Sequence, residues 1–560
     1  VYEIEARIES GFLNEASIVP ALRRLGVRYV LIRNDLLWEE VGLPRPFALA
    51  PLRSDPDLTL VATFGERGEN TRAVSQSPPG ELGRTLLTYE KQLHPVEIYE
   101  VDAPESTRAT DQTPSIILAG DGEGWQRVDA LSPLATHWPI RYAARLDAEE
   151  LRDELATGSV IVVSDTNVRR VVASNGGSVD RSGPLYEVQT TNRADAIFEG
   201  SAAQTVEWMA DAKAVDSSVD SLKQPWARAS QAFDDDLSTA WTTRPFEDPA
   251  GQWLRVTMRE PTQIGRVTLI SAAGQRRASS GSVRLDDGAP WTFDFDDGVA
   301  SIDLGGEVGS EVTFAIEEVT GVGAAQPGFS EIAIAGLDLR PHRRVPHQLF
   351  ELAENDAPLA RAIGAAPLAF SFEREDGVGP VPAETTLRRR FFADSGREFT
   401  ATGRLQAPNP ENVPEGCVPW LDLDEQTVTV RVEPPQSPGR SATYTSCQPM
   451  ILSRGWHEIE GADEVVVDSL VLAPVDLSAP SPDSGAVVVD VIGRSAGEAT
   501  MRVATPESGG QIITNIAYDA AWSAELDGTA IDVLEMDSQL GVRVDGAGDR
   551  ELVLTLSLIH

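Results

Sequence analysis

The chain has 560 residues and a formal net charge of −40, from 87 acidic and 47 basic residues. At the usual ~100–200 residues per domain, this length predicts about three to five domains, each with its own core. The excess of negative charge argues against nucleic-acid binding, because a polyphosphate would be repelled. No apolar run reaches the ~18 residues that a membrane-spanning helix needs.

The first residue is not Met, and the chain opens on Val1-Tyr2-Glu3-Ile4-Glu5 without a basic-then-apolar signal segment. We therefore expect the chain to be part of a longer protein. Its lack of export or membrane segments then carries no information about that longer protein.

Residues 1–185 predict a mixed α/β domain. Apolar residues at helical spacing predict a helix at 18–25, and acidic residues in a first turn favour another at 147–156. Asp165 directly follows a buried strand, which is where open α/β sheets place binding groups. The alternative is a strand-end turn capped by Asp165 and Asn167. Predicted strands of this domain cover residues 27–32, 58–64, 96–101, 115–119 and 160–164.

The remainder of the chain predicts mainly β-structure. Alternating apolar residues predict strands at 266–270, 282–285, 312–316, 331–337, 397–405, 426–432, 464–472 and 551–559. Prolines and changes of composition then predict a β module at 186–340, a linker at 341–385, a second β-sandwich at 386–473, a Pro/Ser linker at 474–485 and a small C-terminal β domain at 486–560. The fold class is therefore multidomain and mainly β, with an N-terminal α/β domain.

Cys417 and Cys447 are the only cysteines, and both fall in the second β-sandwich. In an exported protein, an isolated pair within one domain predicts a disulfide. The alternative is a pair of reduced, buried thiols in a cytosolic protein. Two cysteines cannot form a zinc site alone, and the six histidines are scattered along the chain.

An acidic loop at 234–236 is followed by Ser238-Thr239-Ala240-Trp241 and then by an aromatic-led strand at 252–258. This pattern resembles the first half of a discoidin-like (F5/8 type C) module, a jelly-roll β-sandwich that binds sugars or lipid head groups. In such modules the acidic loop often meets a late Glu on the closing strand, whose counterpart is Glu331. The resemblance therefore implies a structural calcium ion, which prefers oxygen ligands. The implied ligands are Asp234, Asp236, Thr239 and Glu331, and the alternative is a solvated acidic loop.

Aromatic and arginine side chains of the same module are candidates for binding sugars. The resemblance implies that Trp241 packs in the sandwich core, and we expect the same of Trp253. The better candidates lie on nearby loops: Trp226, Arg244, Arg276 and Arg277.

Three passages together resemble the actinobacterial arabinofuranosyltransferase D (AftD) family. They are a strand followed by Ser-Asp-Thr-Asn-x-Arg-Arg at 160–170, the discoidin-like passage at 224–241, and Asn-Ile-Ala-Tyr-Asp-Ala-Ala-Trp-Ser-Ala-Glu-Leu-Asp-Gly at 515–528. The last resembles an element of multispanning GT-C sugar transferases, although Ala520-Ala521 replaces its usual Pro-Gly. Membership would imply a membrane-bound α-(1→3)-arabinofuranosyltransferase, which uses a decaprenyl-phosphate donor to build the arabinan of the cell envelope.

In GT-C enzymes the catalytic carboxylate lies among transmembrane helices, so no catalytic residue is assigned in this chain. The resemblance instead implies a periplasm-facing part that holds acceptor glycan, such as arabinan or lipoarabinomannan, beside the parent's membrane domain. Two other classes stay open: an independent secreted carbohydrate-binding protein or adhesin, and an exported glycoside hydrolase. Common hydrolase and phosphate-loop motifs are not found, and sequence cannot select a glycosidase pair among 87 acids.

Overall fold

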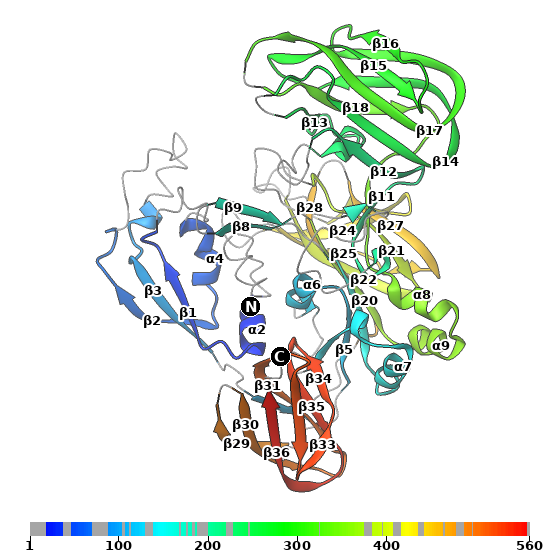
Figure 1. Ribbon diagram of the computed structural model, residues 1–560. Helices are drawn as coiled ribbons and strands as arrows, with labels where there is room; N and C mark the ends of the chain where they lie inside the picture. The colour runs from blue at the N-terminus through cyan, green and yellow to red at the C-terminus, as the bar shows by residue number, and fades with distance from the viewer. Residues whose placement is uncertain are drawn as a thin grey trace.

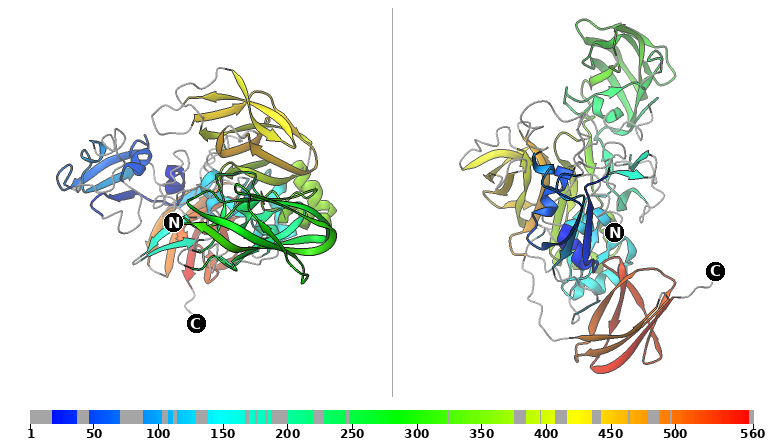
Figure 2. Two further views of the ribbon diagram at one scale, coloured as in Figure 1. Left: turned by 90° about the horizontal axis from the view of Figure 1, so that it is seen from above. Right: turned by 90° about the vertical axis from the view of Figure 1, so that its left-hand side faces the viewer.

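The described residues form four bodies in the computed structural model (Figure 1). A small N-terminal sheet lies beside a central sheet with its helices, and a β-sandwich and a C-terminal β unit lie at opposite ends of the molecule (Figure 2). No helix among these residues is long and apolar enough to cross a membrane. The structure describes residues 18–36, 46–69, 88–102, 107–110, 114–128, 131, 138–166, 170–174, 177–181, 185–186, 200–219, 228–244, 247–323, 325–374, 384–394, 396–406, 416–434, 442–462, 465–477, 487–495 and 497–556.

The N-terminal sheet is antiparallel, with the strand order β1-β3-β2. Alternate residues of its central strand are buried, as expected for a sheet with one face on a core. The elements of this body are α2 (Ile18–Arg24), β1 (Tyr29–Arg33), a 3-10 turn (Pro46–Leu49), α4 (Ala50–Arg53), β2 (Leu58–Phe64) and β3 (Val96–Val101).

The central sheet begins with four parallel strands in the order β6-β5-β7-β20. Strand β7 (Val160–Ser164) is buried along its whole length, which is typical of a parallel strand covered on both faces. Helix α7 (Ala148–Ala156) precedes it and begins with a capping box between Asp147 and Glu150. The other elements are β5 (Ile116–Ala119), α6 (Gly122–Arg127), β6 (Ile140–Tyr142) and a 3-10 turn (Ala143–Arg145).

Residues 341–385, which were expected to be a linker, instead carry part of this core. Helices α8 (Gln348–Glu354) and α9 (Ala357–Ala365) pack beside α7 and the sheet, and β20 (Leu368–Glu373) pairs with both β7 and β28 (Val466–Pro474). The predicted α/β domain and second β-sandwich therefore share one sheet. Helix α9 has Pro358 in its first turn after an Asp356 cap, so prolines in this segment partly mark a helix start.

The second β block continues the same sheet beyond β28. Its strands alternate between buried and exposed residues, and their inner side chains join the large core that also covers β7 and β20. The strands are β21 (Arg388–Ala393), β22 (Arg397–Gln406), β23 (Cys417–Leu423), β24 (Gln426–Glu433), β25 (Ala442–Ser446), β26 (Met450–Leu452) and β27 (Gly455–Gly461).

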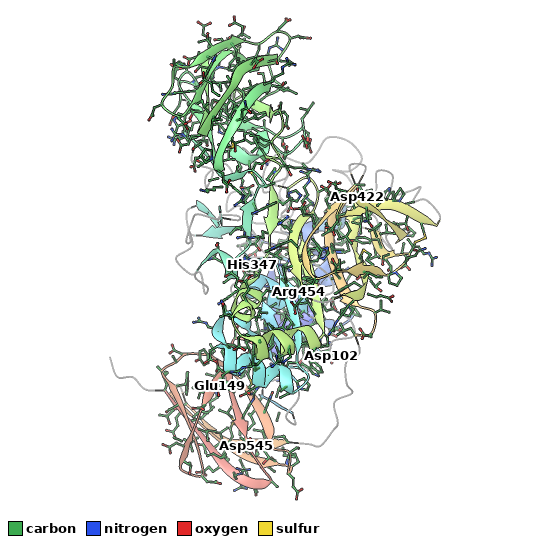
Figure 3. The ribbon with its side chains drawn as sticks, turned by 90° about the vertical axis from the view of Figure 1, so that its right-hand side faces the viewer. Asp102, Glu149, His347, Asp422, Arg454 and Asp545 are labelled. Atoms are coloured by element: carbon green, nitrogen blue, oxygen red, sulfur yellow. A yellow bond between two sulfur atoms is a disulfide. The ribbon has the colours of Figure 1, made fainter. Side chains whose placement is uncertain are left out.

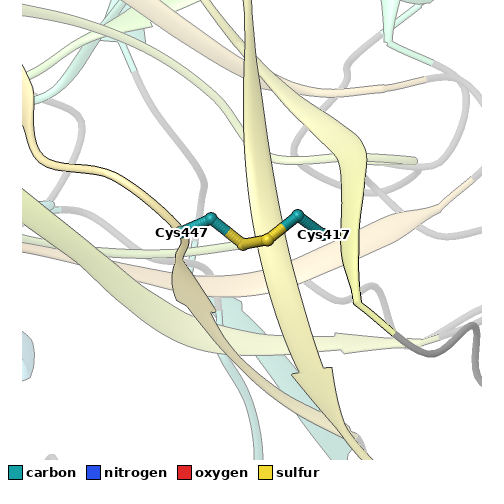
Figure 4. Close-up of a disulfide and its surroundings, with 2 residues drawn as sticks. All are labelled: Cys417 and Cys447. Atoms are coloured by element: carbon teal, nitrogen blue, oxygen red, sulfur yellow. A yellow bond between two sulfur atoms is a disulfide. The ribbon is translucent and has the colours of Figure 1, made fainter.

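A disulfide joins Cys417 to Cys447 in this block, which confirms the predicted bridge (Figure 4). Cys417 begins β23, and Cys447 directly follows β25. Strand β24 lies between these two strands in the sheet, so the bridge crosses over it. The disulfide therefore cross-links β23 to β25 across β24. The chain itself connects these strands only through loops.

Replacing both cysteines with Ala should destabilise the second β block. The bridge closes a separation of 30 residues, for which loop entropy gives about 3.5 kcal/mol. Urea denaturation of the wild type and of the double variant measures the difference, and a reductant should affect only the wild type. Alkylation of two thiols without reductant, detected by intact mass, would contradict the bridge.

The β-sandwich is built on two long strands, β14 (Trp253–Ser271) and β17 (Val299–Gly321), which pair with each other across two register shifts. Their alternate side chains fill one core. The remaining elements are β12 (Ala212–Ser217), a 3-10 turn (Ala229–Ala232), β13 (Trp241–Thr242), β15 (Arg276–Leu285), β16 (Trp291–Asp294) and β18 (Gly328–Ile334). No α-helix interrupts the described part of this module.

Two short strands join the sandwich to the central sheet. Strand β11 (Val206–Trp208) enters the module, and β19 (His342–Arg344) leaves it. They pair with each other, and β19 also pairs with β21 of the second β block. The module is therefore an insertion whose two ends form one stalk, and this stalk is part of the central sheet. Nearby short elements are β8 (Arg170–Ser174), β9 (Gly177–Arg181), β10 (Leu185–Tyr186) and a 3-10 turn (Ser201–Ala203).

The C-terminal β unit consists of two sheets around one core. One of them includes β4 (Thr107–Thr110), which comes from the N-terminal part of the chain. The other strands are β29 (Val488–Arg494), β30 (Glu498–Thr505), β31 (Gly510–Ala517), β32 (Trp522–Leu526), β33 (Thr529–Ile531), β34 (Val533–Met536), β35 (Gln539–Val544) and β36 (Gly548–Leu556). The last predicted strand, at 551–559, is confirmed as far as residue 556.

Asp537 fastens this unit to the N-terminal part. It occupies the turn between β34 and β35 and has no exposed surface. Its carboxylate accepts hydrogen bonds from Arg24 Nη1 (3.3 Å) and from the backbone N–H of Ile140 (3.1 Å), and it also pairs with Arg108. The predicted fold class, multidomain and mainly β with an α/β part at the N-terminus, is thus confirmed.

Candidate functional site

The acidic loop of the sandwich gathers oxygen atoms around one hydroxyl group. Thr239 Oγ1 lies 2.8 and 2.9 Å from the two carboxylate oxygens of Asp234. It also lies 2.9 Å from the carbonyl oxygen of Asp236 and 3.4 Å from that of Gln231. A hydroxyl carries one hydrogen, so it cannot satisfy four acceptors. The loop therefore holds more acceptors than donors.

Glu331 of β18 approaches the same loop and accepts a hydrogen bond from the backbone N–H of Asp235 (3.1 Å). Burial raises the pKa of Asp234 to about 7. Burial, together with the negative charges of Asp235 and Asp234, raises the pKa of Glu331 to about 8. Without a cation, the loop thus favours carboxyl groups that keep their protons.

The four predicted calcium ligands do not all contribute their side chains. The Asp236 carboxylate accepts from the backbone N–H of Ser238 (2.8 Å), and its carbonyl oxygen faces Thr239 instead. Among the described residues, no three His, Cys, Asp or Glu side chains are grouped as a metal site. A cation here would be held by Asp234, Glu331 and the Thr239 hydroxyl, completed by carbonyl oxygens. Such a mixed oxygen set suits calcium.

Three of the predicted sugar-binding residues lie near one segment of the sandwich, residues 320–327. Arg276 and Arg277 pair with Gly321 and Thr320 at the start of β15, and Arg277 is exposed. Arg244 follows Thr243, whose backbone N–H donates to the carbonyl of Pro327 (2.9 Å). The Arg244 side chain lies 3.5 Å from Glu247. Trp226 falls outside the described residues.

The two tryptophans expected in the core behave differently. Trp241 has no exposed surface and stacks on Phe329, with ring centroids 5.4 Å apart. Trp253 is only half-buried, and the guanidinium of Arg255 lies 4.7 Å from its ring centroid. The core prediction is therefore confirmed for Trp241 and wrong for Trp253, which takes the outward position of an alternating strand.

Asp165 belongs to a buried ion network rather than to an open binding edge. Its carboxylate accepts hydrogen bonds from Arg389 Nε (2.7 Å) and from the backbone N–H of Glu373 (2.8 Å). Arg127 lies 3.6 Å from the same carboxylate. Because Asp165 is 1% exposed, it is closed to a ligand, and the competing interpretation of a structural strand end describes it better.

Three successive arginines of β21, which sequence reasoning missed, connect the core to the module. Successive side chains of a strand alternate between its faces, so Arg389 points into the buried network while Arg388 and Arg390 point the other way. Arg388 Nη1 donates to the carbonyl of Asp234 (2.9 Å) and Nε to Glu460 (3.1 Å). The run of three arginines, Arg388-Arg389-Arg390, was the available signal.

Comparisons with known proteins agree with this architecture. A family model described as "Alpha-(1->3)-arabinofuranosyltransferase, N-terminal GT-C domain" matches residues 1–196. A curated alpha-(1->3)-arabinofuranosyltransferase of Mycolicibacterium smegmatis is 27% identical over 282 residues, which cover 46% of this chain and 19% of that protein. One of Mycobacterium tuberculosis is 28% identical over 288 residues, with the same coverage. The match thus spans about a fifth of the length of these relatives.

A solved structure extends the similarity to almost the whole chain. The cryo-EM structure of the arabinofuranosyltransferase AftD from mycobacteria superposes with a TM-score of 0.71. It covers 99% of this chain and 57% of that one at 14% identity, a level that speaks for the fold. Fold and site define a mainly β chain in which a β-sandwich with an acidic loop is inserted into an α/β-containing core. Residues 1–196 match the AftD family model, and just under half of the chain aligns with curated AftD-type relatives.

Proposed function

We propose that this chain is the periplasm-facing portion of a membrane-bound α-(1→3)-arabinofuranosyltransferase of cell-envelope arabinan synthesis, and that it holds the acceptor glycan. The observation that carries the proposal is the sandwich inserted, by a paired stalk, into a chain whose residues 1–196 match the AftD family model. The Cys417–Cys447 disulfide supports an oxidising compartment outside the cytoplasm. Transfer of arabinose would belong to the parent's membrane domain.

Glycan binding without turnover tests this proposal. Calorimetry with arabinan or lipoarabinomannan fragments should show weak, saturable binding by the purified chain. Replacing both Arg276 and Arg277 with Ala should weaken that binding about tenfold, or about 1.4 kcal/mol, because one half-buried and one exposed donor to sugar hydroxyls are lost. Arg284→Ala, exposed on the same strand, is the matched control. Arabinose transfer from a lipid-linked donor by this chain alone would overturn the proposal.

We further propose that the acidic loop binds a structural calcium ion. The support is the surplus of oxygen acceptors around Thr239 and the approach of Glu331, from β18, to the loop that carries Asp234. A divalent cation would replace the protons that these carboxyls otherwise keep. Its effect is to fix the loop that contacts Arg388, and so to steady the junction with the second β block.

Removing calcium should make the melting temperature of the sandwich depend on pH. The pKa values of about 7 for Asp234 and about 8 for Glu331 exceed the ~4 of unfolded carboxyls, so only the folded module keeps these protons. With a chelator, stability should therefore fall as the pH rises from about 4 to 8. Calcium should abolish this fall and add about 2.7 kcal/mol at a hundredfold excess over Kd. Magnesium should not substitute, and melting curves unchanged by chelator, with no metal found by elemental analysis, would contradict the site.

A further inference from the structure

A cavity of about 360 Å³ lies between the sandwich and the second β block. On the sandwich side it is lined by Phe233 and Asp235 beside the acidic loop, by residues of β18 that include Glu331, and by the segment 337–342 that leads to the stalk. On the other side it is lined by the β23–β24 turn and by β27. Asp422 lies near the end of the second block that faces the sandwich (Figure 3). The volume falls in the range of ligand pockets, about 300–1,000 Å³.

The junction that forms this cavity is held by many contacts. Besides the stalk, Arg340 Nη2 of the sandwich side binds Glu460 of β27 (2.7 Å). The guanidinium of Arg390 lies 3.9 Å from the ring centroid of Trp208 and 5.2 Å from that of Trp456. Such cation–π contacts strengthen when they are removed from water. These contacts hold the two walls of the cavity together.

Negative charge dominates the cavity lining, but it is not evenly compensated. Glu460 is bound by Arg340 and Arg388, and Glu458 by Arg390. Asp422 and Glu425 have no side-chain partner among the described residues. Burial lowers the pKa of His342, a further lining residue, so that the ring does not add positive charge. The lining therefore disfavours phosphates and uronates.

The same lining also argues against a single metal ion as the occupant. Apart from Glu331, which belongs to the proposed calcium site, the lining carboxylates in the described parts of the chain are not drawn together into a metal-binding group. They are distributed around a cavity that also contains apolar side chains, such as Phe233, Ile334 and Ile459. Arg340 supplies a donor, because its Nε is buried without a hydrogen-bond partner and lies 3.9 Å from Asp235. Scattered acceptors, one donor and apolar patches match an extended ligand with hydroxyl groups.

We propose that this cavity is a second glycan-binding site, which takes a neutral sugar segment. Asp422 and Glu425 would accept hydrogen bonds from sugar hydroxyls, and Arg340 Nε would donate to a ring or hydroxyl oxygen. Carboxylates accept strong hydrogen bonds, and neutral sugars bring no charge that the lining would repel. The inference rests on the proposed function for its ligand class, but it uses residues distinct from Arg276 and Arg277.

Calorimetry on the full chain with a neutral arabinofuranose oligosaccharide tests the inference. It is run in the Arg276→Ala/Arg277→Ala background, so that the two arginines of β15 do not contribute. Asp422→Asn with Glu425→Gln should weaken the remaining binding at least tenfold. Both side chains lie on or beside an exposed turn, and thermal melting confirms folding. Glu433→Gln, exposed at the end of β24, is the matched control and should bind like its parent.

Two further probes give the class of ligand. A glucuronic-acid oligosaccharide should bind at least tenfold more weakly than the neutral one, and spermidine should not displace the neutral sugar. Displacement by spermidine would overturn the inference in favour of a polyamine site. If the affinity for the neutral sugar is unchanged by the Asp422 and Glu425 substitutions, this inference is overturned and the proposed function is not. If the unaltered chain binds no sugar, both are overturned.

Discussion

Asp537→Ala will loosen the C-terminal β unit from the rest of the molecule. The substitution removes a carboxylate that is fully buried against Arg24 and Arg108. Removing one partner from a buried ion pair typically costs about 3–5 kcal/mol, because the remaining charge stays in a poor environment. The backbone bond from Asp537 to Ile140 (2.8 Å) depends on the same turn and should weaken with it.

Hydrogen exchange measures this effect directly. Residues 533–544 and their partners 107–110 and 138–142 should exchange much faster in Asp537→Ala, while the sandwich should be unchanged. Asp549→Asn is the control, because its ion pair with Arg502 is exposed on both sides (65% and 68%) and is worth little. Equal exchange in the wild type and Asp537→Ala would show that Asp537 does not fasten the unit.

Arg389→Met should destabilise the central sheet by a similar amount, about 3–5 kcal/mol. Arg389 has no exposed surface, and it binds Asp165, Glu384 and the carbonyl of Glu373 (2.6 Å). Met fills similar volume but leaves two buried carboxylates without their main cation. The free energy of unfolding in urea gives the cost.

Two companion variants make the Arg389 experiment specific. Arg431→Met changes an exposed arginine of β24 and should leave stability within about 0.5 kcal/mol. Adding Asp165→Asn to Arg389→Met should recover part of the lost stability, because one of the two unpaired carboxylates is then neutral. A loss below about 1 kcal/mol for Arg389→Met would mean that Arg127, 3.6 Å from Asp165, compensates for the missing group.

Local patterns predicted single elements better than their assembly. The helix before β7, β7 itself and the strands of the sandwich follow from periodicity and capping. The sheet that joins β7 to β20 and β28 does not, because the pairing of residues 161–164 with residues 368–371 depends on packing that no local pattern encodes. Residues 341–385 were interpreted as a linker from their prolines, because the pairing of β20 with β7 and β28 cannot be seen in that segment alone.

The candidate site divides in the same way. Asp234 and Thr239 lie close together in one loop, as their spacing in the sequence suggests. The closing strand β18 brings Glu331 to the same loop. That the Asp236 carboxylate would bind Ser238 instead depends on a side-chain rotation that spacing cannot show. The contact from Arg388 to this loop joins residues 154 positions apart, and only the folded junction reveals it.

The stalk has a consequence for how such a chain could arise and change. Trp208 and His342 face each other as paired residues of β11 and β19, so the sandwich leaves the core where it entered. Antiparallel neighbours of this kind can be closed by a two-residue hairpin turn. The whole sandwich can therefore be inserted, removed or exchanged at a single point of the gene. The pairing of β11 with β19, which completes the central sheet, would be kept.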